Sequence, residues 1–312
     1  MSDAVISVRG LRKSYGANEA VRGIDLDVRG GEIFAFLGPN GAGKTTTVEI
    51  LEGYRQRSAG DVSVLGVDPA KPPREWRERV GVVLQECRMQ PELTVRETVE
   101  LYAGYYRDPR PVDETLGLVG LTSEADVRAG KLSGGQQRRL DVALALIGDA
   151  ELLFLDEPTT GFDPSARRQA WDVITNLRDL GKTVFLTTHY MDEAQALADR
   201  ATIIVGGRIV ASGPPDRLGQ QTATTEVRFR VPDGVRIEDL PVDPAGHDGR
   251  YVILRTGEPV RVLNELTGWA LARGLDLPAL DVGVPSLEDV YLELTGTAER
   301  EAGAAPREGV GG

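Results

Sequence analysis

Residues 132–139 read Leu-Ser-Gly-Gly-Gln-Gln-Arg-Arg, and the segments on either side of this stretch decide which fold it belongs to. Upstream, the apolar run Ile33–Leu37 leads into Gly38-Pro39-Asn40-Gly41-Ala42-Gly43-Lys44-Thr45. Downstream, the run Leu152–Glu157 is apolar until it closes on two acids. Short apolar runs of this kind are typical of strands buried on both faces. The three segments together predict a nucleotide-binding domain of the α/β class.

The glycine-rich loop at residues 38–45 predicts a phosphate site. Its glycines allow the backbone to wrap closely around the phosphates of ATP, and a helix N-terminus presents free N–H groups to anions. Lys44 is expected to reach the β- and γ-phosphates, and the Thr45 hydroxyl to ligate Mg²⁺. The competing interpretation is a chance glycine-rich turn before a helix, and the buried strand before the loop argues against it.

The acids at the end of the second run, Asp156 and Glu157, predict hydrolytic chemistry. Carboxylates at the end of a buried strand are costly unless they hold a metal or take part in a reaction. Asp156 fits a Mg²⁺ ligand, directly or through water, and Glu157 fits the general base that deprotonates an attacking water. The alternative is a pair of acids that caps the next helix.

The stretch at 132–139 predicts a second anion site. Ser133, Gly134 and Gly135 stand just before a helix, so a hydroxyl and free N–H groups would face an anion there. One chain does not need two receptors for a γ-phosphate. A plain serine-capped helix would account for Ser133 but not for the Gly134-Gly135-Gln136 that follows.

In this order, the three motifs resemble the ATP-binding cassette family, and the resemblance covers about residues 4 to 220. It implies an α/β P-loop NTPase cassette with an inserted helical subdomain at about 86–148, and ATP and Mg²⁺ as cofactors. It also implies a homodimer, in which Ser133 to Gln136 of one copy close on the nucleotide held by the other.

The resemblance assigns further roles near the phosphates. His189 matches the switch histidine that contacts the γ-phosphate and helps to position Glu157, although a lone histidine is more often structural. Gln85 matches the hinge glutamine near Mg²⁺ and water, although glutamine at a strand end is common. Thr46 matches an additional phosphate contact.

Two more residues match motifs of the family. Asp163 matches the loop that contacts the other cassette, and Asp163-Pro164 is also a helix N-cap followed by proline, two compatible roles. Most relatives carry leucine where Phe162 stands, a departure that changes packing more than chemistry. Tyr15 matches the aromatic residue that stacks on adenine, and its alternative is a plain turn tyrosine.

The composition suits a folded soluble protein of more than one domain. The chain has 312 residues, of which 41% are hydrophobic and 27% charged. Its apolar runs are far shorter than the ~18 residues that span a bilayer, and its start lacks a signal core. The single cysteine, Cys87, excludes an internal disulfide. A net charge of −12 argues against a nucleic-acid partner.

The pattern of strands and helices predicts three regions: an ATP-binding domain at 1–221, a small α+β domain at 222–296 and a disordered tail at 297–312. The first domain should hold a parallel sheet, with Val5–Val8 as an edge strand. A capping box at Thr94 and Glu97 should open a helix that carries Tyr102 and Tyr106 on one face.

The C-terminal segment Leu287–Gly296 resembles the end of cassettes in the daunorubicin-resistance-like group of bacterial drug exporters. That resemblance implies an exporter subunit for drugs or antibiotics, peripheral on the cytoplasmic face of the membrane, with a separate polytopic permease. The helical arm, with Met89, Leu93 and the tyrosines Tyr102, Tyr105 and Tyr106, is the expected docking surface; core packing is the alternative for these aromatic residues.

Two other functions stay open at this point. A cassette can act on ribosomes or DNA, but ribosome-acting relatives usually carry two cassettes and DNA-repair relatives carry long coiled coils. This chain has one cassette and no heptad pattern. Import, or export of lipid or polysaccharide, by a similar cassette is the other alternative.

Overall fold

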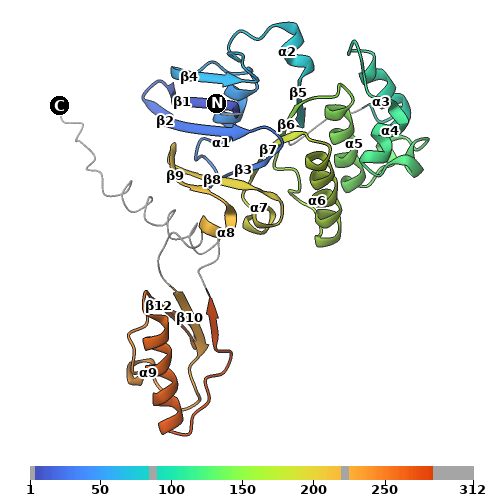
Figure 1. Ribbon diagram of the computed structural model, residues 1–312. Helices are drawn as coiled ribbons and strands as arrows, with labels where there is room; N and C mark the ends of the chain where they lie inside the picture. The colour runs from blue at the N-terminus through green and yellow to red at the C-terminus, as the bar shows by residue number, and fades with distance from the viewer. Residues whose placement is uncertain (1–3, 84–89, 219–224, 284–312) are drawn as a thin grey trace, which may run out of the picture. The chain divides into compact units, whose positions relative to one another are not determined.

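The computed structural model describes residues 4–83, 90–218 and 225–283 of the chain. These residues form two compact units, one ending at Pro215 and one beginning at Asp216 (Figure 1). The first unit contains two sheets and most of the helices, and the second contains one sheet and one long helix.

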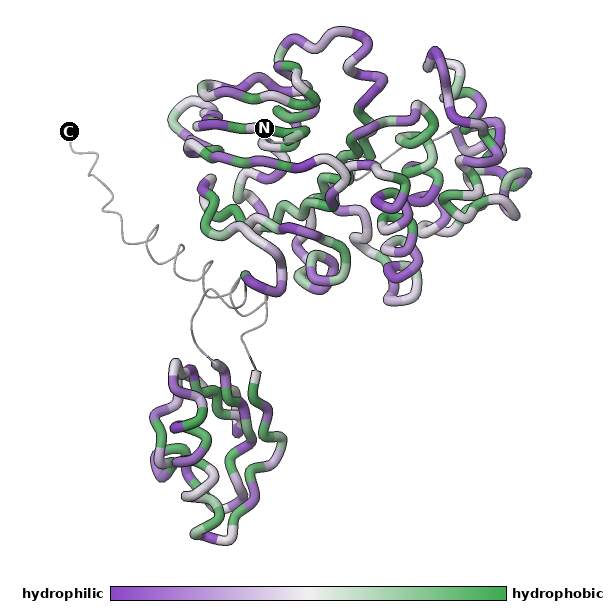
Figure 2. The backbone as a smooth tube through the Cα atoms, viewed as in Figure 1, coloured by the Kyte–Doolittle hydropathy of each residue, from purple (hydrophilic) through white to green (hydrophobic). Residues whose placement is uncertain are grey.

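The main sheet of the first unit has six strands in the order β5-β6-β7-β3-β8-β9. They are β5 (Val80–Val83), β6 (Leu152–Asp156), β7 (Thr183–Thr188), β3 (Ile33–Leu37), β8 (Arg200–Val205) and β9 (Arg208–Gly213). Every pair is parallel except β8 with β9. The prediction of an α/β fold with a parallel sheet is confirmed. In Figure 2, green hydrophobic stretches run through the first unit where its strands lie.

Phenylalanines set the register of the three central strands. Phe34, Phe185 and Phe154 lie directly opposite one another across β3, β7 and β6. The Phe185 ring centroid is 5.4 Å from that of Phe34 and 5.5 Å from that of Phe154, and all three rings are buried. Because a slip by one residue would turn this row to the other face, the aromatic contacts specify one alignment.

A second sheet, of three antiparallel strands in the order β2-β1-β4, covers the first. Its strands are β1 (Ala4–Tyr15), β2 (Asn18–Arg29) and β4 (Ala59–Val64). Helix α1 (Lys44–Leu51) buries Val48 and Leu51 in the core that both sheets share. The prediction that Val5–Val8 forms an edge strand was wrong: β1 is central, and its alternation arises because only one face of this sheet is buried.

The helical arm lies beside the main sheet, where α3, α4 and α5 gather together (Figure 1). Its helices are α3 (Val95–Ala103), α4 (Val112–Leu118) and α5 (Gly134–Leu146), with single 3₁₀ turns at Thr122–Glu124 and Ala129–Lys131. The capping box of Thr94 and Glu97 is present. The helix ends at Ala103, however, so Tyr106 lies in the turn after it and not on the predicted helical face.

The remaining helices of this unit are α2 (Arg74–Glu78), α6 (Pro164–Asp179) and α7 (Met191–Leu197). Asp163 caps α6: its Oδ1 accepts from the N–H groups of Ser165 at 2.8 Å and Ala166 at 2.9 Å, with proline in the first turn, as the sequence predicted.

The second unit is an α+β structure with its own core. Helix α9 (Pro259–Ala272) packs on an antiparallel sheet of order β11-β12-β10-β13, formed by Gly246–Asp248, Tyr251–Thr256, Thr225–Arg230 and Asp281–Gly283. The core includes Phe229, Val252 and Leu266. A four-residue helix, α8 (Pro215–Leu218), lies in the sequence at the boundary between the two units. The helix predicted at Ser286–Gly296 and the predicted tail lie outside the described residues.

In the part of the chain that the structure describes, no helix has the length and apolar character needed to cross a membrane.

Gly148, just after α5, makes room for the Tyr106 ring. A Cβ atom at this position would lie 2.2 Å from Cε1 of that ring. We therefore expect Gly148→Ala to destabilise the first unit by about 1–3 kcal/mol, the usual cost of overpacking. Thermal unfolding of Gly148→Ala measures this effect.

The matched control is Gly117→Ala in α4, where the nearest atom to the new Cβ is 3.9 Å away, and this variant should keep or raise the unfolding temperature. The double variant Gly148→Ala/Tyr106→Ala should be no less stable than Tyr106→Ala alone. If the two losses simply added, the clash with the ring would not be the cause.

Candidate nucleotide-binding site

The topology brings three loops to one edge of the main sheet. Since β3, β7 and β6 are parallel neighbours, their carboxyl ends meet at the same edge. The loop at 38–43 follows β3, His189 follows β7, and Asp156 ends β6 with Glu157 next to it. Crevices at the carboxyl ends of parallel strands are the usual ligand sites of open α/β sheets.

Glycines of the loop allow the backbone to pass close to its neighbours. Gly43 has a φ of 106°, and a Cβ atom there would lie 2.6 Å from the Ala20 carbonyl oxygen. A Cβ atom at Gly38 would lie 2.4 Å from the Ile204 carbonyl oxygen. These two positions therefore exclude any larger residue.

The Lys44 ammonium lies inside the curve of this loop. Its Nζ donates to the carbonyl oxygens of Gly38 at 2.6 Å and Pro39 at 3.3 Å. Burial lowers the pKa of Lys44, while the nearby carboxylates of Glu157 and Asp156 act in the opposite direction. The structure thus places one buried cation between the loop and the two acids.

The other predicted residues of this region differ in exposure. Asn40 and Thr45 are exposed, and Thr46 is half-buried. Tyr15, at the end of β1, is 41% exposed, and its ring is contacted by the Lys13 ammonium at 5.0 Å and the Arg55 guanidinium at 5.3 Å. Gln85 lies outside the described residues.

The acids and the histidine form one contact group. Glu157 has a φ of 46°, and its Oε1 lies 3.3 Å from Nδ1 of His189. The Thr160 hydroxyl donates to the other carboxylate oxygen of Glu157 at 3.0 Å. A hydroxyl from β7, that of Thr187, donates to Asp156 Oδ1 at 2.5 Å. A carboxylate beside an imidazole at this edge is an arrangement suited to accepting a proton from water.

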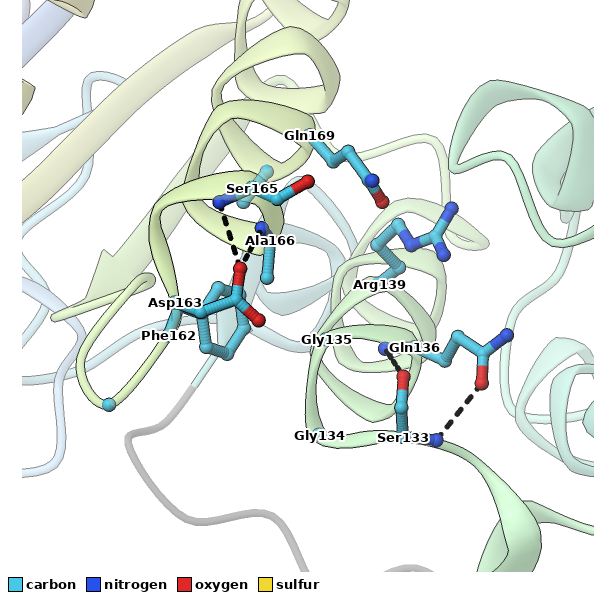
Figure 3. A pocket seen from close by; sticks show the side chains of 12 residues that line it. Ser133, Gly134, Gly135, Gln136, Arg139, Phe162, Asp163, Ser165, Ala166 and Gln169 are labelled. Carbon is cyan, nitrogen blue, oxygen red and sulfur yellow. Dashed lines mark hydrogen bonds between the residues drawn. The ribbon is translucent and has the colours of Figure 1, made fainter.

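The residues of the 132–139 stretch lie in a different place, a pocket of about 360 Å³ between the N-termini of α5 and α6. Figure 3 shows Ser133 and Gly134 facing it from one helix, with Phe162 and Asp163 facing it from the other. None of the residues lining this pocket belongs to the loop at 38–45. The predicted phosphate residues and the predicted second anion site are therefore two separate groups in one chain.

Ser133 and Gln136 form a capping box at the start of α5. Ser133 Oγ accepts from the N–H group of Gln136 at 3.3 Å, and Gln136 Oε1 accepts from the N–H group of Ser133 at 2.9 Å. Gln136 thus has a local structural role that the sequence interpretation did not assign to it. The box uses neither the N–H group of Gly134 nor that of Gly135, which are first-turn donors without an intrahelical acceptor.

With this geometry in place, the comparisons identify the family. Residues 21–160 match the family model "ABC transporter", and residues 225–286 match "ABC transporter domain-containing protein-like, C-terminal domain". The chain is 39% identical over 306 residues to the Nod factor export ATP-binding protein I of Rhizobium sp. (strain N33), covering 95% of this chain and 98% of that protein. The chain belongs to the ABC transporter family.

Other comparisons agree with this assignment. The Nod factor export ATP-binding protein I of Rhizobium meliloti (strain 1021) is 38% identical over 300 residues, 93% of this chain and 88% of that protein. The cassette resembles cbiO1 from Clostridium perfringens, described as part of the ABC transporter complex cbiONQ, with a TM-score of 0.65 and 27% identity over 70% of this chain and 91% of that one. It also shares its fold with the cassette MJ0796, solved as a dimer with ADP and phosphate, with a TM-score of 0.59 and 24% identity over 67% and 98%.

This ABC ATPase contains polar residues near the site that the sequence interpretation missed. Arg138 of α5 donates through Nη2 to the Asp156 carbonyl oxygen at 2.7 Å and through Nε to that of Pro158 at 3.2 Å. Glu193 of α7 is fully buried and accepts from the Thr159 hydroxyl at 2.8 Å. No local pattern marks either residue, because Arg138 stands in a polar run with Gln137 and Arg139, and Glu193 follows another acid.

Glu52 is a third residue that the sequence interpretation missed. It caps the C-terminal end of α1, where the helix dipole disfavours a negative charge, and an acid at such a position is a signal that the sequence carries. Glu52 lines a cavity of about 410 Å³ with Tyr54 and Trp76. Burial, together with the negative charges of Asp156 and Glu49, raises the pKa of Glu52 to about 8.

This pKa predicts that Glu52 makes the cassette less stable as the pH rises. The folded state holds the proton up to about pH 8, whereas an ordinary glutamate loses it near 4.5. The folded state therefore binds more protons between these values, and its stability falls across that window. The side chain introduced by Glu52→Gln cannot ionise. We therefore expect the unfolding temperature of Glu52→Gln to exceed that of the wild type by an amount that grows with pH and reaches on the order of 5 °C at pH 8.5.

The measurement is the difference in unfolding temperature between Glu52→Gln and the wild type, taken at pH 5.5 and at pH 8.5. Other titrating groups, including Glu193, are present in both proteins and cancel in the comparison. A difference that does not change with pH would show that Glu52 is ionised throughout.

Proposed function

We propose that this chain is the ATPase subunit of an exporter. The residues at the edge of the main sheet and those of the 132–139 stretch act in it as the two halves of a composite ATPase site. The observation that supports this best is the contact group at the sheet edge, where Glu157 lies beside His189 with the Lys44 ammonium buried nearby. The residues of the 38–45 loop and Thr46 hold the phosphates of ATP in this proposal, and Tyr15 stacks on the adenine.

Hydrolysis in this proposal begins when Glu157 accepts a proton from the attacking water. His189 orients the carboxylate and contacts the γ-phosphate, and Lys44 balances the charge that develops on it. Thr160, which donates to Glu157, leaves one carboxylate oxygen directed at His189.

The donors present at the site fit Mg²⁺. The Thr45 hydroxyl is exposed and Asp156 supplies a carboxylate, and Gln85 is the third proposed ligand. The described residues contain no cluster of three or more His, Cys, Asp or Glu side chains, and Mg²⁺ held by one or two protein oxygens and the phosphates of a nucleotide does not require one. When bound, the ion neutralises charge on the β- and γ-phosphates.

The glycines of the 132–139 stretch, which we call the signature stretch, support a dimer. Helix α5, which begins in this stretch, is the signature helix, and the pocket that the stretch lines is the signature pocket. A Cβ atom at Gly134 would meet nothing within 4 Å, and one at Gly135 would make only an ordinary contact with Ala166. Neither has a positive φ. The chain's own packing does not require glycine here, so close approach from outside the chain is the better explanation. We assign that approach to the ATP of a second copy, with Ser133, Gln136 and Asp163 beside it.

A membrane partner would occupy apolar surface on the helical arm. Leu101 is 45% exposed and Tyr105 is 68% exposed, whereas Tyr106 packs against Gly148. Of the predicted docking residues, Met89 lies outside the described residues and Tyr102 contacts Tyr105 edge to face. Leu101 and Tyr105 are therefore the residues that we propose for contact with a separate permease, which would place the subunit on the cytoplasmic face of the membrane.

Export is favoured over import and over action on ribosomes or DNA, because the relatives named above are export subunits that this chain matches over almost their whole length. The segment 287–296, which lies outside the described residues, resembles the cassettes of drug exporters, and we propose a drug or antibiotic as the cargo on that basis. Action on ribosomes or DNA has no comparable support in the described residues.

The first test measures hydrolysis and dimerisation. Glu157→Gln keeps a hydrogen-bonding group but not a base, so we expect it to bind ATP and to lose turnover by about 100-fold or more. It should accumulate a dimer with Mg-ATP, detected by light scattering. Adding Gly134→Ala should weaken that dimer by about tenfold, because a methyl group shields the free N–H donors, while the unfolding temperature stays equal or rises.

Normal turnover by Glu157→Gln would reject Glu157 as the base. Unchanged dimerisation of Glu157→Gln/Gly134→Ala would reject the signature stretch as the contact with the second copy, and would leave the assignment of the base untouched.

The second test identifies the partner. Tagged Glu157→Gln, isolated from native membranes in Mg-ATP, should bring down a polytopic membrane protein in equal amount. Changing Leu101 and Tyr105 to serine should reduce its recovery, whereas Leu180→Ser, at an exposed apolar residue after α6, should not.

Recovery of ribosomes or DNA in place of a membrane protein would contradict the export role. Equal recovery with the Leu101/Tyr105 variant would reject the helical arm as the docking surface.

A further inference from the structure

Thr187, near the end of β7, joins the two acids of the site. Its hydroxyl donates to Asp156 Oδ1 at 2.5 Å and accepts from the N–H group of Glu157 at 3.1 Å. The backbone carbonyl of Thr187 accepts from the same N–H group, also at 3.1 Å. One residue thus fixes a side-chain oxygen of Asp156 and the main chain of Glu157.

The placement of this hydroxyl follows from the sheet. Thr187 is paired with Asp156 in the register of β7 and β6, and it is 1% exposed. Parallel strands at equal register carry their side chains on the same face, so the hydroxyl is enclosed beside the carboxylate. A buried hydroxyl between these two groups has both its donor and acceptor roles satisfied.

Glu157 needs such a restraint. Its φ of 46° is a left-handed conformation that costs a non-glycine residue free energy and persists only when its surroundings fix it. Among the described residues, Thr187 holds the N–H group of Glu157 through two acceptors. Because Thr187 stands near the end of β7, two residues before His189, it links the two acids to the histidine that contacts Glu157.

We propose that Thr187 is a positioning residue that sets the orientation of the Asp156 carboxylate and the Glu157 backbone for hydrolysis. This inference rests on the proposed roles of Asp156 and Glu157. Loss of the hydroxyl leaves the carbonyl of residue 187 to hold Glu157, so the larger effect falls on Asp156, which loses its donor. A carboxylate free to rotate binds a metal ion less well, since fewer of its orientations direct an oxygen at the ion.

The test compares Thr187→Val with Thr187→Ser in the full chain. Val has nearly the same shape without the hydroxyl, and Ser keeps the hydroxyl. We expect Thr187→Val to lower kcat by roughly ten- to a hundredfold, as for loss of a hydrogen bond to a charged group, with a smaller change in KM. Thr187→Ser should stay within about threefold of the wild type.

A second readout does not depend on turnover. Affinity for a fluorescent ATP analogue is measured with and without Mg²⁺. Thr187→Val should lose most of the gain in affinity that Mg²⁺ brings, and keep the affinity measured without the ion. The control is Thr202→Val, which removes another fully buried threonine hydroxyl, one bonded to Ser212 at 2.8 Å, and should leave both affinities unchanged.

An unchanged kcat and Mg²⁺ dependence in Thr187→Val would overturn the proposal, as would a Thr187→Ser variant as impaired as Thr187→Val. Thr187 would have a structural role only if Thr187→Val and Thr202→Val both lowered the unfolding temperature and Thr187→Val kept the gain in nucleotide affinity that Mg²⁺ brings. The Mg²⁺ readout is independent of which residue is the base, so its failure is distinguishable from failure of the Glu157 assignment.

Discussion

The alignment of β3, β7 and β6 is the constraint on which the site depends. Phe34, Phe185 and Phe154 form a row across these strands, and side chains two residues further along a strand lie on the same face. On β7 and β6 those residues are Thr187 and Asp156. Burial of the aromatic row therefore fixes the register that brings a hydroxyl to 2.5 Å from a carboxylate. A slip of β7 by one residue would turn Thr187 and the Phe185 ring to the opposite face of the sheet from Asp156 and Phe154.

The sequence predicted the strands of this sheet well because burial on both faces leaves unbroken apolar runs that end at polar loops. It also predicted the loop at 38–45, whose glycines meet a local need of the backbone: Gly43 must adopt a positive φ beside Ala20. Features that depend on tertiary neighbours were harder to predict from the sequence. Whether a half-buried strand is central or at an edge depends on what pairs with it, so β1 was misplaced.

Other misses have the same physical origin. Periodicity continued the helix after Thr94 as far as Tyr106, but the chain turns at Gly104 and packs the Tyr106 ring against Gly148. The predicted site residues came from local motifs, and nothing local marks Thr187 or the positive φ of Glu157, because both follow from strand register. Glu52 carried a local signal, an acid at a helix C-terminus, but its raised pKa depends on the nearby Asp156 and Glu49.

The two groups of site residues are separate in space but joined by one short segment, residues 157–163. It begins at Glu157, in contact with His189, and ends at Asp163, on the signature pocket. Two buried contacts hold it between those points: Arg138 donates to the carbonyl of Pro158, and the Thr159 hydroxyl donates to Glu193 of α7. Glu193 is held in turn by Trp171, which donates to it at 3.2 Å. Because Arg138 belongs to the helix that Ser133 caps, a shift of that helix must move Pro158 or break a buried hydrogen bond, which is costly. The segment is thus restrained by the signature helix at one point and by the helix after His189 at another. In the proposed dimer, closure on the signature stretch and the position of Glu157 would be coupled through these contacts and not through the nucleotide alone.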